Sequence, residues 1–126
     1  MQLSQILKIE FVNANLLANN KSEALAELAN TIIEGGLKLD HSSIIAVLQQ
    51  RENLGSTGIG EGVAIPHGKI SNLGDIVVAF GRSLKGVEYD AQDGKPVHLF
   101  FLLLAPKNST GEHLKILARI SKMLKI

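Results

Sequence analysis

The sequence predicts a single α/β domain: a mixed β-sheet with helices packed on both of its faces. Its 126 residues are 45% hydrophobic and 20% charged, which is the composition of one globular domain. Apolar residues recur at helical spacing in two segments, and Val97–Leu104 has the apolar character on both faces that a central strand covered by helices requires. The chain contains no internal repeat, linker or low-complexity tract, so residues 1–126 are expected to form one domain.

Two helices are expected in the first half of the chain. Apolar residues from Leu25 to Ile33 recur at helical spacing, and Asn20 and Glu23 are placed as a capping pair before them. Asp40 can cap a second helix, whose apolar stripe continues to Arg51. Arg51 therefore places a positive charge at the end of an otherwise apolar face.

The glycine-rich segment 55–62 is expected to be an irregular loop, because its glycine density is too high for regular structure. It leads into a short strand, Val63–Ile65, which Pro66 ends, so that His67 lies just past a strand end. Pro66 has a fixed φ and favours extended geometry before it, which aims the histidine ring. The loop offers backbone N–H and hydroxyl donors of the kind that bind oxyanions. A loop histidine without a function is the alternative interpretation.

Two buried strands, Ile76–Phe80 and Val97–Leu104, are expected in the second half of the chain. Between them, Gly81–Lys95 contains the glycines and the Asp-Gly pair of a hairpin or a short excursion at the sheet edge. Ser109–Glu112 has the spacing of a capping box that opens a last amphipathic helix, and His113 falls in its first turn.

Composition and charge exclude several classes of protein. The formal net charge is +1 and no basic run is longer than two residues, so the charge pattern of a nucleic-acid-binding protein is missing. The absence of cysteine excludes disulfides, a thiolate nucleophile and a cysteine-based zinc site. The longest apolar run, Leu99–Ala105, is too short to cross a membrane, and the N-terminus lacks a signal-peptide pattern. We therefore expect a cytoplasmic protein without membrane insertion.

The signatures of common enzyme sites are also absent. A dinucleotide-binding fingerprint fails because Val63 stands where a third glycine is needed after Gly58 and Gly60. Neither Gly-Lys pair has the spacing of a phosphate-binding P-loop, and the G-x-S-x-G motif of hydrolases is missing. No two histidines have the i, i+4 spacing of a helical metal site. We expect neither a metal nor a cofactor.

The segment Glu52–Gly68 resembles the active-site signature of enzyme IIA of the bacterial phosphotransferase system (PTS), of the fructose/mannitol type (type 2) that includes the nitrogen-regulatory IIA proteins. The signature has an acidic or amide residue, six free positions, an aliphatic-Gly pair and then aliphatic-Ala-aliphatic-Pro-His-Gly. The chain matches every fixed position. The runs 96–106 and 112–118 are similar to the family's central strand and to the helix start that follows.

This resemblance implies a phosphoryl carrier with two protein partners. His67 would accept a phosphoryl group from the histidine carrier protein HPr, or from its nitrogen-branch relative, and pass it to enzyme IIB during sugar uptake. The alternative is a nitrogen-regulatory IIA protein whose phosphorylation state controls the binding of other proteins. The sequence alone leaves both functions open.

The same resemblance places Arg51 and His113 in the site with His67. A neutral imidazole is a competent nucleophile, and phosphoryl transfer needs positive or N–H groups around the three phosphoryl oxygens. Arg51 would supply charge, and His113 with the first-turn amides of its helix would bind phosphate; the alternative for His113 is a helix-surface position. The loop residues Ser56, Thr57 and Gly58 are candidate phosphate donors or ordinary turn residues.

The C-terminus departs from the family pattern. Family members usually continue to a final amphipathic helix, whereas this sequence stops at Ile126. Either the protein lacks the usual C-terminal helix or the sequence does not include it. Residues 1–126 alone would then expose apolar surface and either associate into a homo-oligomer or unfold at a lower temperature.

Overall fold

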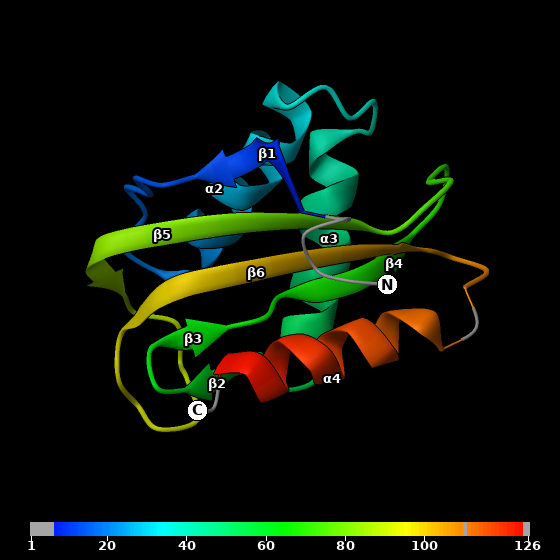
Figure 1. Cartoon of the computed structure of the whole chain (residues 1–126). Helices are drawn as coiled ribbons and strands as arrows, with labels where there is room; N and C mark the ends of the chain where they lie inside the picture. The colour runs from blue at the N-terminus through cyan, green and yellow to red at the C-terminus, as the bar shows by residue number, and fades with distance from the viewer. Residues whose placement is uncertain (1–6, 110, 125–126) are drawn as a thin grey trace.

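Strand β6 (Val97–Pro106) lies at the centre of a six-stranded mixed sheet. It pairs antiparallel with β5 (Val77–Val87), which in turn pairs parallel with β1 (Leu7–Asn13). The structure is a computed structural model that describes residues 7–109 and 111–124 (Figure 1).

The other side of β6 pairs with two short strands that follow each other along the chain. These are β3 (Val63–Ala64) and β4 (His67–Ile70), and both run parallel to β6. Strand β2 (Gly58–Gly60) pairs antiparallel with β3 and completes this edge. Residues 65 and 66 interrupt the edge, because a proline has no N–H to donate to the ladder.

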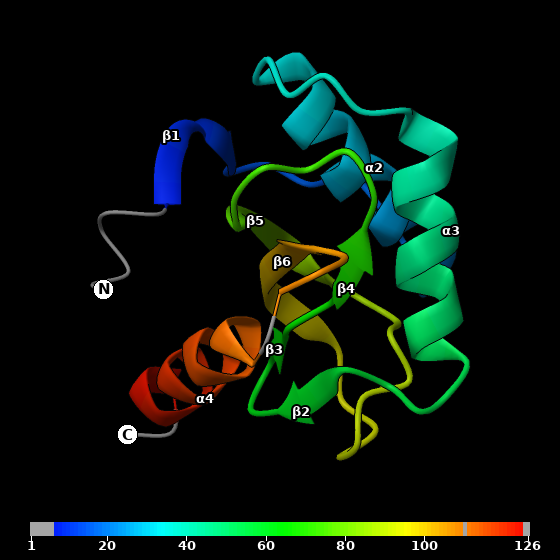
Figure 2. The same cartoon turned by 90° about the vertical axis from the view of Figure 1, so that its right-hand side faces the viewer.

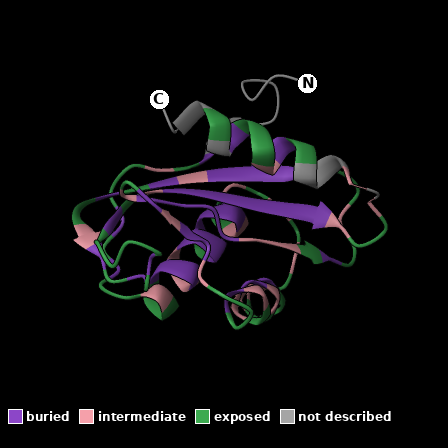
Figure 3. Ribbon diagram, turned by 90° about the horizontal axis from the view of Figure 1, so that it is seen from below, coloured by how far each residue is buried: buried purple, intermediate pink, exposed green. Residues whose placement is uncertain are grey.

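Helices cover both faces of the sheet, as expected for this fold class. α2 (Lys21–Glu34) and α3 (His41–Glu52) pack together on one face, and α4 (Glu112–Leu124) packs against β6 on the other (Figure 2). The buried residues form one cluster on each side of the sheet, and the strands between them are largely buried (Figure 3). Within residues 7–109 and 111–124, no helix is long and apolar enough to cross a membrane.

Local capping explains where the first two helices begin. The side chain of Asn20 accepts a hydrogen bond from the Glu23 backbone N–H at 2.9 Å, and Asp40 accepts one from the Ser43 N–H at 3.1 Å. Both caps agree with the sequence-based expectation. The last helix begins at Glu112, later than the capping box at Ser109 places it.

Three strand predictions are wrong in detail. The loop 55–62 contains a strand, β2, because its glycines can still pair with β3. His67 lies just past the end of β3, as expected, but it also begins a further strand, β4, since the chain resumes pairing with β6 immediately after Pro66. The strand expected over Ile76–Phe80 runs from Val77 to Val87, so the first part of the expected excursion is strand.

A glycine sets the distance between α3 and β4. A Cβ atom at Gly68 would overlap Cγ1 of Val47, which lies on the side of α3 that faces β4. Arg51 follows Val47 by one helical turn, and His67 precedes Gly68. The close approach at Gly68 therefore brings the last turn of α3 to the start of β4.

We predict that Gly68→Ala lowers the free energy of unfolding by about 1–3 kcal/mol, the usual cost of overpacking. Shortening the opposing side chain in a Gly68→Ala/Val47→Ala double variant should recover part of this loss, because the overlapping methyl group is removed. Urea unfolding curves of the two single variants and the double variant measure this coupling.

Gly74→Ala is the matched control. Its added Cβ would meet nothing within 4 Å, and its φ is outside the left-handed region. We expect it to change the free energy of unfolding by less than about 1 kcal/mol. The overlap argument is wrong if the two glycine variants unfold at the same urea concentration.

Candidate functional site

His67 stands at the break in the edge of the sheet. It is half-buried at the first position of β4, opposite Leu103 of β6. Its ring Nδ1 lies 2.9 Å from the backbone oxygen of Ile65. A carbonyl oxygen only accepts hydrogen bonds, so Nδ1 carries the proton and Nε2 has the free lone pair.

Arg51 lies against this second nitrogen. From the last turn of α3, its Nε donates to His67 Nε2 over 3.3 Å, and its Nη1 donates to the Gly55 oxygen at 2.9 Å. A guanidinium group has donors only, which agrees with Nε2 as the acceptor. The structure thus brings together two of the three residues that the sequence placed in the catalytic site.

The surroundings favour the neutral form of the ring. Burial lowers the pKa of His67 below its usual 6.5, and the nearby Arg51 charge lowers it further. The hydrogen bond to Ile65 and the negative charge of Glu52 act in the opposite direction, but they do not reverse the shift. A neutral imidazole with its lone pair on Nε2 is a nucleophile.

The loop residues predicted to bind phosphate already have protein partners. Ser56 Oγ donates to the backbone oxygen of Tyr89 at 3.2 Å and accepts from the Gly58 N–H at 3.1 Å. Thr57 is buried, and its backbone N–H and hydroxyl both bond to the carboxylate of Glu52. Binding of phosphate by these groups stays a prediction and would require these bonds to exchange.

His113 lies in the first turn of α4. Its side chain is outside the part of the chain that the structure describes. Helix α4 packs on β6 from the side opposite α2 and α3. The proposed role of His113 in phosphate binding therefore stays a prediction.

A buried polar cluster behind the site was missed by the sequence analysis. The Glu52 carboxylate binds Thr57, the Tyr89 hydroxyl at 3.1 Å and the Lys21 ammonium group at 3.0 Å. Glu52 occupies the first fixed position of the signature, and this was the one feature of the sequence that could have pointed to the cluster. Nothing in the local sequence connects Lys21 or Tyr89 with the site, because they are distant along the chain.

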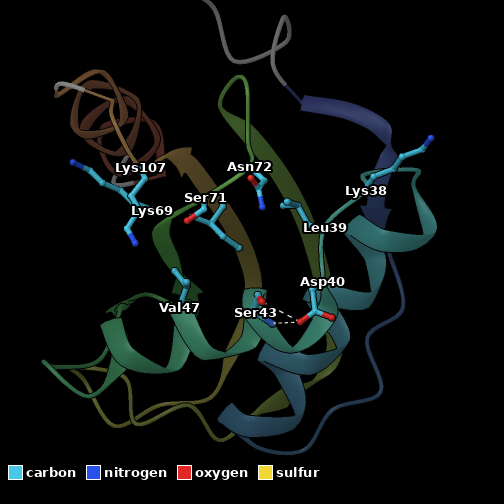
Figure 4. A pocket seen from close by; sticks show the side chains of 10 residues that line it. Lys38, Leu39, Asp40, Ser43, Val47, Lys69, Ser71, Asn72 and Lys107 are labelled. Carbon is cyan, nitrogen blue, oxygen red and sulfur yellow. Dashed lines mark hydrogen bonds between the residues drawn. The ribbon is translucent and has the colours of Figure 1, made fainter.

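A cavity of about 380 Å³ lies beside the candidate site rather than in it (Figure 4). Val47 and Lys69 line it, next to the close approach of α3 and β4, together with residues from the α2–α3 connection and from the segments after β4 and β6. Neither His67 nor Arg51 lines it. The Arg51–His67 pair, in which both residues are half-buried, therefore lies outside this cavity. Among the described side chains, no group of histidine and acidic residues is arranged to hold a metal ion.

Comparison with known proteins identifies the family of this chain. The family model for the phosphoenolpyruvate-dependent sugar phosphotransferase system, EIIA 2, matches residues 5–126. The chain is 41% identical to a nitrogen regulatory protein of Bradyrhizobium diazoefficiens over 125 residues, which are 99% of this chain and 81% of that protein. It is 34% identical to the fructose-specific EIIABC component of the Bacillus subtilis PTS, with 98% of this chain covered, but spans only 20% of that protein.

A solved structure shows the same fold. The crystal structure of the nitrogen regulatory protein IIA-Ntr from Neisseria meningitidis superimposes with a TM-score of 0.90 at 36% identity. The superposition covers 98% of this chain and 84% of that one. With a family model that matches nearly the whole sequence, the conclusion is direct: this chain belongs to the EIIA 2 family of the phosphoenolpyruvate-dependent sugar phosphotransferase system.

Proposed function

We propose that the protein is a phosphoryl carrier that accepts a phosphoryl group on Nε2 of His67. The observation that carries this proposal is the arrangement of the ring: Ile65 holds the proton on Nδ1, and Arg51 lies 3.3 Å from Nε2. The lone pair is therefore directed toward the group that can stabilise an incoming anion.

The transfer step balances without a metal or a cofactor. The Nε2 lone pair forms a bond to phosphorus as the bond from phosphorus to the donor breaks, and the donor leaves with that electron pair. The proton on Nδ1 stays on the ring, hydrogen-bonded to the Ile65 oxygen. The positive charge that the ring gains is offset by the phosphoryl oxygens, and Arg51 exchanges its bond to Nε2 for one to a phosphoryl oxygen.

The donor in this proposal is HPr or its nitrogen-branch relative, and the acceptor is an enzyme IIB. The similarity to a fructose-specific component that combines A, B and C parts supports the acceptor. Family membership supports a role in the phosphotransferase system. A cytoplasmic location, expected from the sequence, is part of the same proposal.

A second candidate function is regulation. The 41% identity to a nitrogen regulatory protein and the TM-score of 0.90 with IIA-Ntr favour it. In that case phosphorylation of His67 controls binding to another protein instead of supplying an enzyme IIB. Transfer from the phosphorylated protein to a purified fructose-specific enzyme IIB separates the two functions, because only a transport carrier should be discharged by it.

We predict that His67→Gln takes up no phosphate from HPr, enzyme I and phosphoenolpyruvate. The wild-type protein should take up one phosphate per chain, acid-labile and base-stable as phosphohistidine is. The control is His98→Gln, since His98 is exposed on β6 and bonds to the Ser83 oxygen at 2.9 Å. Uptake by His67→Gln at the wild-type level would rule out the proposed acceptor.

Arg51→Ala should lower the initial rate of uptake at least tenfold while one phosphate per chain is still reached, because Arg51 stabilises the transferred group without carrying it. We expect the same direction for His113→Ala. Arg82→Ala is a matched control, because Arg82, like Arg51, donates to a backbone oxygen, here from Nε to that of Ala14, but projects from β5. Quenched-flow rates within twofold of wild type in a folded Arg51→Ala protein would contradict this role.

The rate of uptake should depend on the protonation of His67. Its pKa is lowered in the folded protein, so the ring stays neutral at pH 7 and the rate should fall only below the usual 6.5. Because the unfolded chain binds this proton more readily, the His67 contribution to stability should be lost as pH falls from 6.5 through the folded pKa. Ring NMR measures the midpoint, which Arg51→Ala should raise by removing a nearby positive charge. A wild-type midpoint above 6.5 would refute this prediction.

A further inference from the structure

Glu52 is a buried carboxylate with an unusual number of partners. Its side chain is 1% exposed, and four donors reach its two oxygens. Oε1 accepts from the Thr57 N–H at 3.1 Å and lies 3.0 Å from Lys21 Nζ, while Oε2 accepts from the Thr57 and Tyr89 hydroxyls. A buried charge is tolerated only where such partners compensate for lost hydration, so this arrangement has to form as a unit.

The cluster joins elements that are distant along the chain. Lys21 is the first residue of α2, Glu52 is the last of α3, and Tyr89 follows β5. The Lys21 ammonium group also lies 4.9 Å from the centre of the Tyr89 ring. Glu52 is therefore fixed from two sides that do not belong to the phosphate-accepting site.

One path of hydrogen bonds leads from Glu52 to Nδ1 of His67. The Thr57 N–H donates to the Glu52 carboxylate, and the backbone oxygen of Thr57 accepts from the Ile65 N–H at 3.0 Å. The Ile65 oxygen in turn accepts from His67 Nδ1 at 2.9 Å. The carbonyl that selects the tautomer of the ring is thus positioned through Thr57.

A second path leads to Nε2. The backbone oxygen of Glu52, not its carboxylate, accepts from the Gly55 N–H at 3.0 Å, and the Gly55 backbone oxygen accepts from Arg51 Nη1 at 2.9 Å. The same guanidinium group contacts His67 Nε2 through Nε. Both ring nitrogens are therefore held by the segment 51–57, and the Glu52 carboxylate closes this segment by binding the Thr57 N–H and hydroxyl.

We infer that Glu52, supported by Lys21 and Tyr89, is a positioning residue for phosphoryl transfer: it holds segment 51–57 so that the His67 ring presents its Nε2 lone pair beside Arg51. The inference rests on the proposed role of His67 as acceptor. The Glu52 carboxylate acts through Thr57, and so through the conformation of segment 51–57, and has no direct contact with the phosphoryl group.

Glu52→Gln tests this role because it keeps the size of the side chain and removes its charge. The amide loses the ion pair with Lys21 and exchanges one acceptor oxygen for a donor. We expect the initial rate of phosphate uptake to fall at least tenfold, with one phosphate per chain still reached, because small displacements of reacting groups are costly. In the unphosphorylated protein, ring ¹⁵N NMR should show loss of the pure Nδ1–H tautomer.

Glu27→Gln is the matched control. Glu27 also lies on a helix and also accepts backbone N–H bonds, from Leu17 and Ala18, but it belongs to α2 and has no connection to His67 through these bonds. It should lower stability while the His67 tautomer and the uptake rate remain as in wild type. If the uptake rate or the ring signals change in both glutamate variants, the change reflects a loss of stability alone.

Two smaller changes cover the case in which Glu52→Gln does not fold. Tyr89→Phe and Thr57→Val each remove hydroxyl bonds within the cluster and nearly keep the shape of the side chain. Each should slow uptake by about threefold or more and shift the ring signals in the same direction. Wild-type rates and ring signals in folded variants would overturn the inference.

The outcome also separates this inference from the proposed function. If the wild-type protein takes up no phosphate, His67 is not an acceptor, and the ring NMR still shows whether Glu52 sets its tautomer. If the wild type is phosphorylated and Glu52→Gln reacts equally fast, the acceptor is correct and the positioning role is wrong.

Discussion

The contact between Val47 and Gly68 is the constraint on which the site depends. It lets α3 approach β4 closely enough for the last helical turn to reach the first residue of the strand. Without it, Arg51 and His67 would belong to separate surfaces. A residue with no functional group therefore determines the geometry of the two residues that have one.

Among the described residues near His67, the two cations Lys21 and Arg51 have different partners. Lys21 lies 3.0 Å from Glu52 and offsets the negative charge of its carboxylate. The positive charge of Arg51 lowers the pKa of His67, and its Nε faces Nε2. The same guanidinium group thus keeps the ring unprotonated before transfer and can stabilise the oxygens afterwards.

The sequence was sufficient where local interactions determine the structure. The caps at Asn20 and Asp40 and the apolar stripes predict α2 and α3 because a helix is stabilised largely within its own segment. Strands depend on partners that are distant along the chain. Strand β5 runs past Gly81 because it keeps pairing with Phe100 and Leu99 of β6, which no local pattern reveals. The glycine is needed there because Leu16 and Leu28 occupy the space where a Cβ would lie. For the same reason the motif identified His67 but not the cluster that contains Lys21 and Tyr89.

The exposure of His67 would limit how long a phosphoryl group stays bound to it. In the proposed function the acceptor, His67, is half-exposed at the edge of the sheet, which would open it to water as well as to a partner protein. A phosphoryl group bound there would be lost by hydrolysis whenever no acceptor arrives. The phosphorylated fraction of the protein would then report the balance between supply from the donor and spontaneous loss, and it would decline by itself when supply stops.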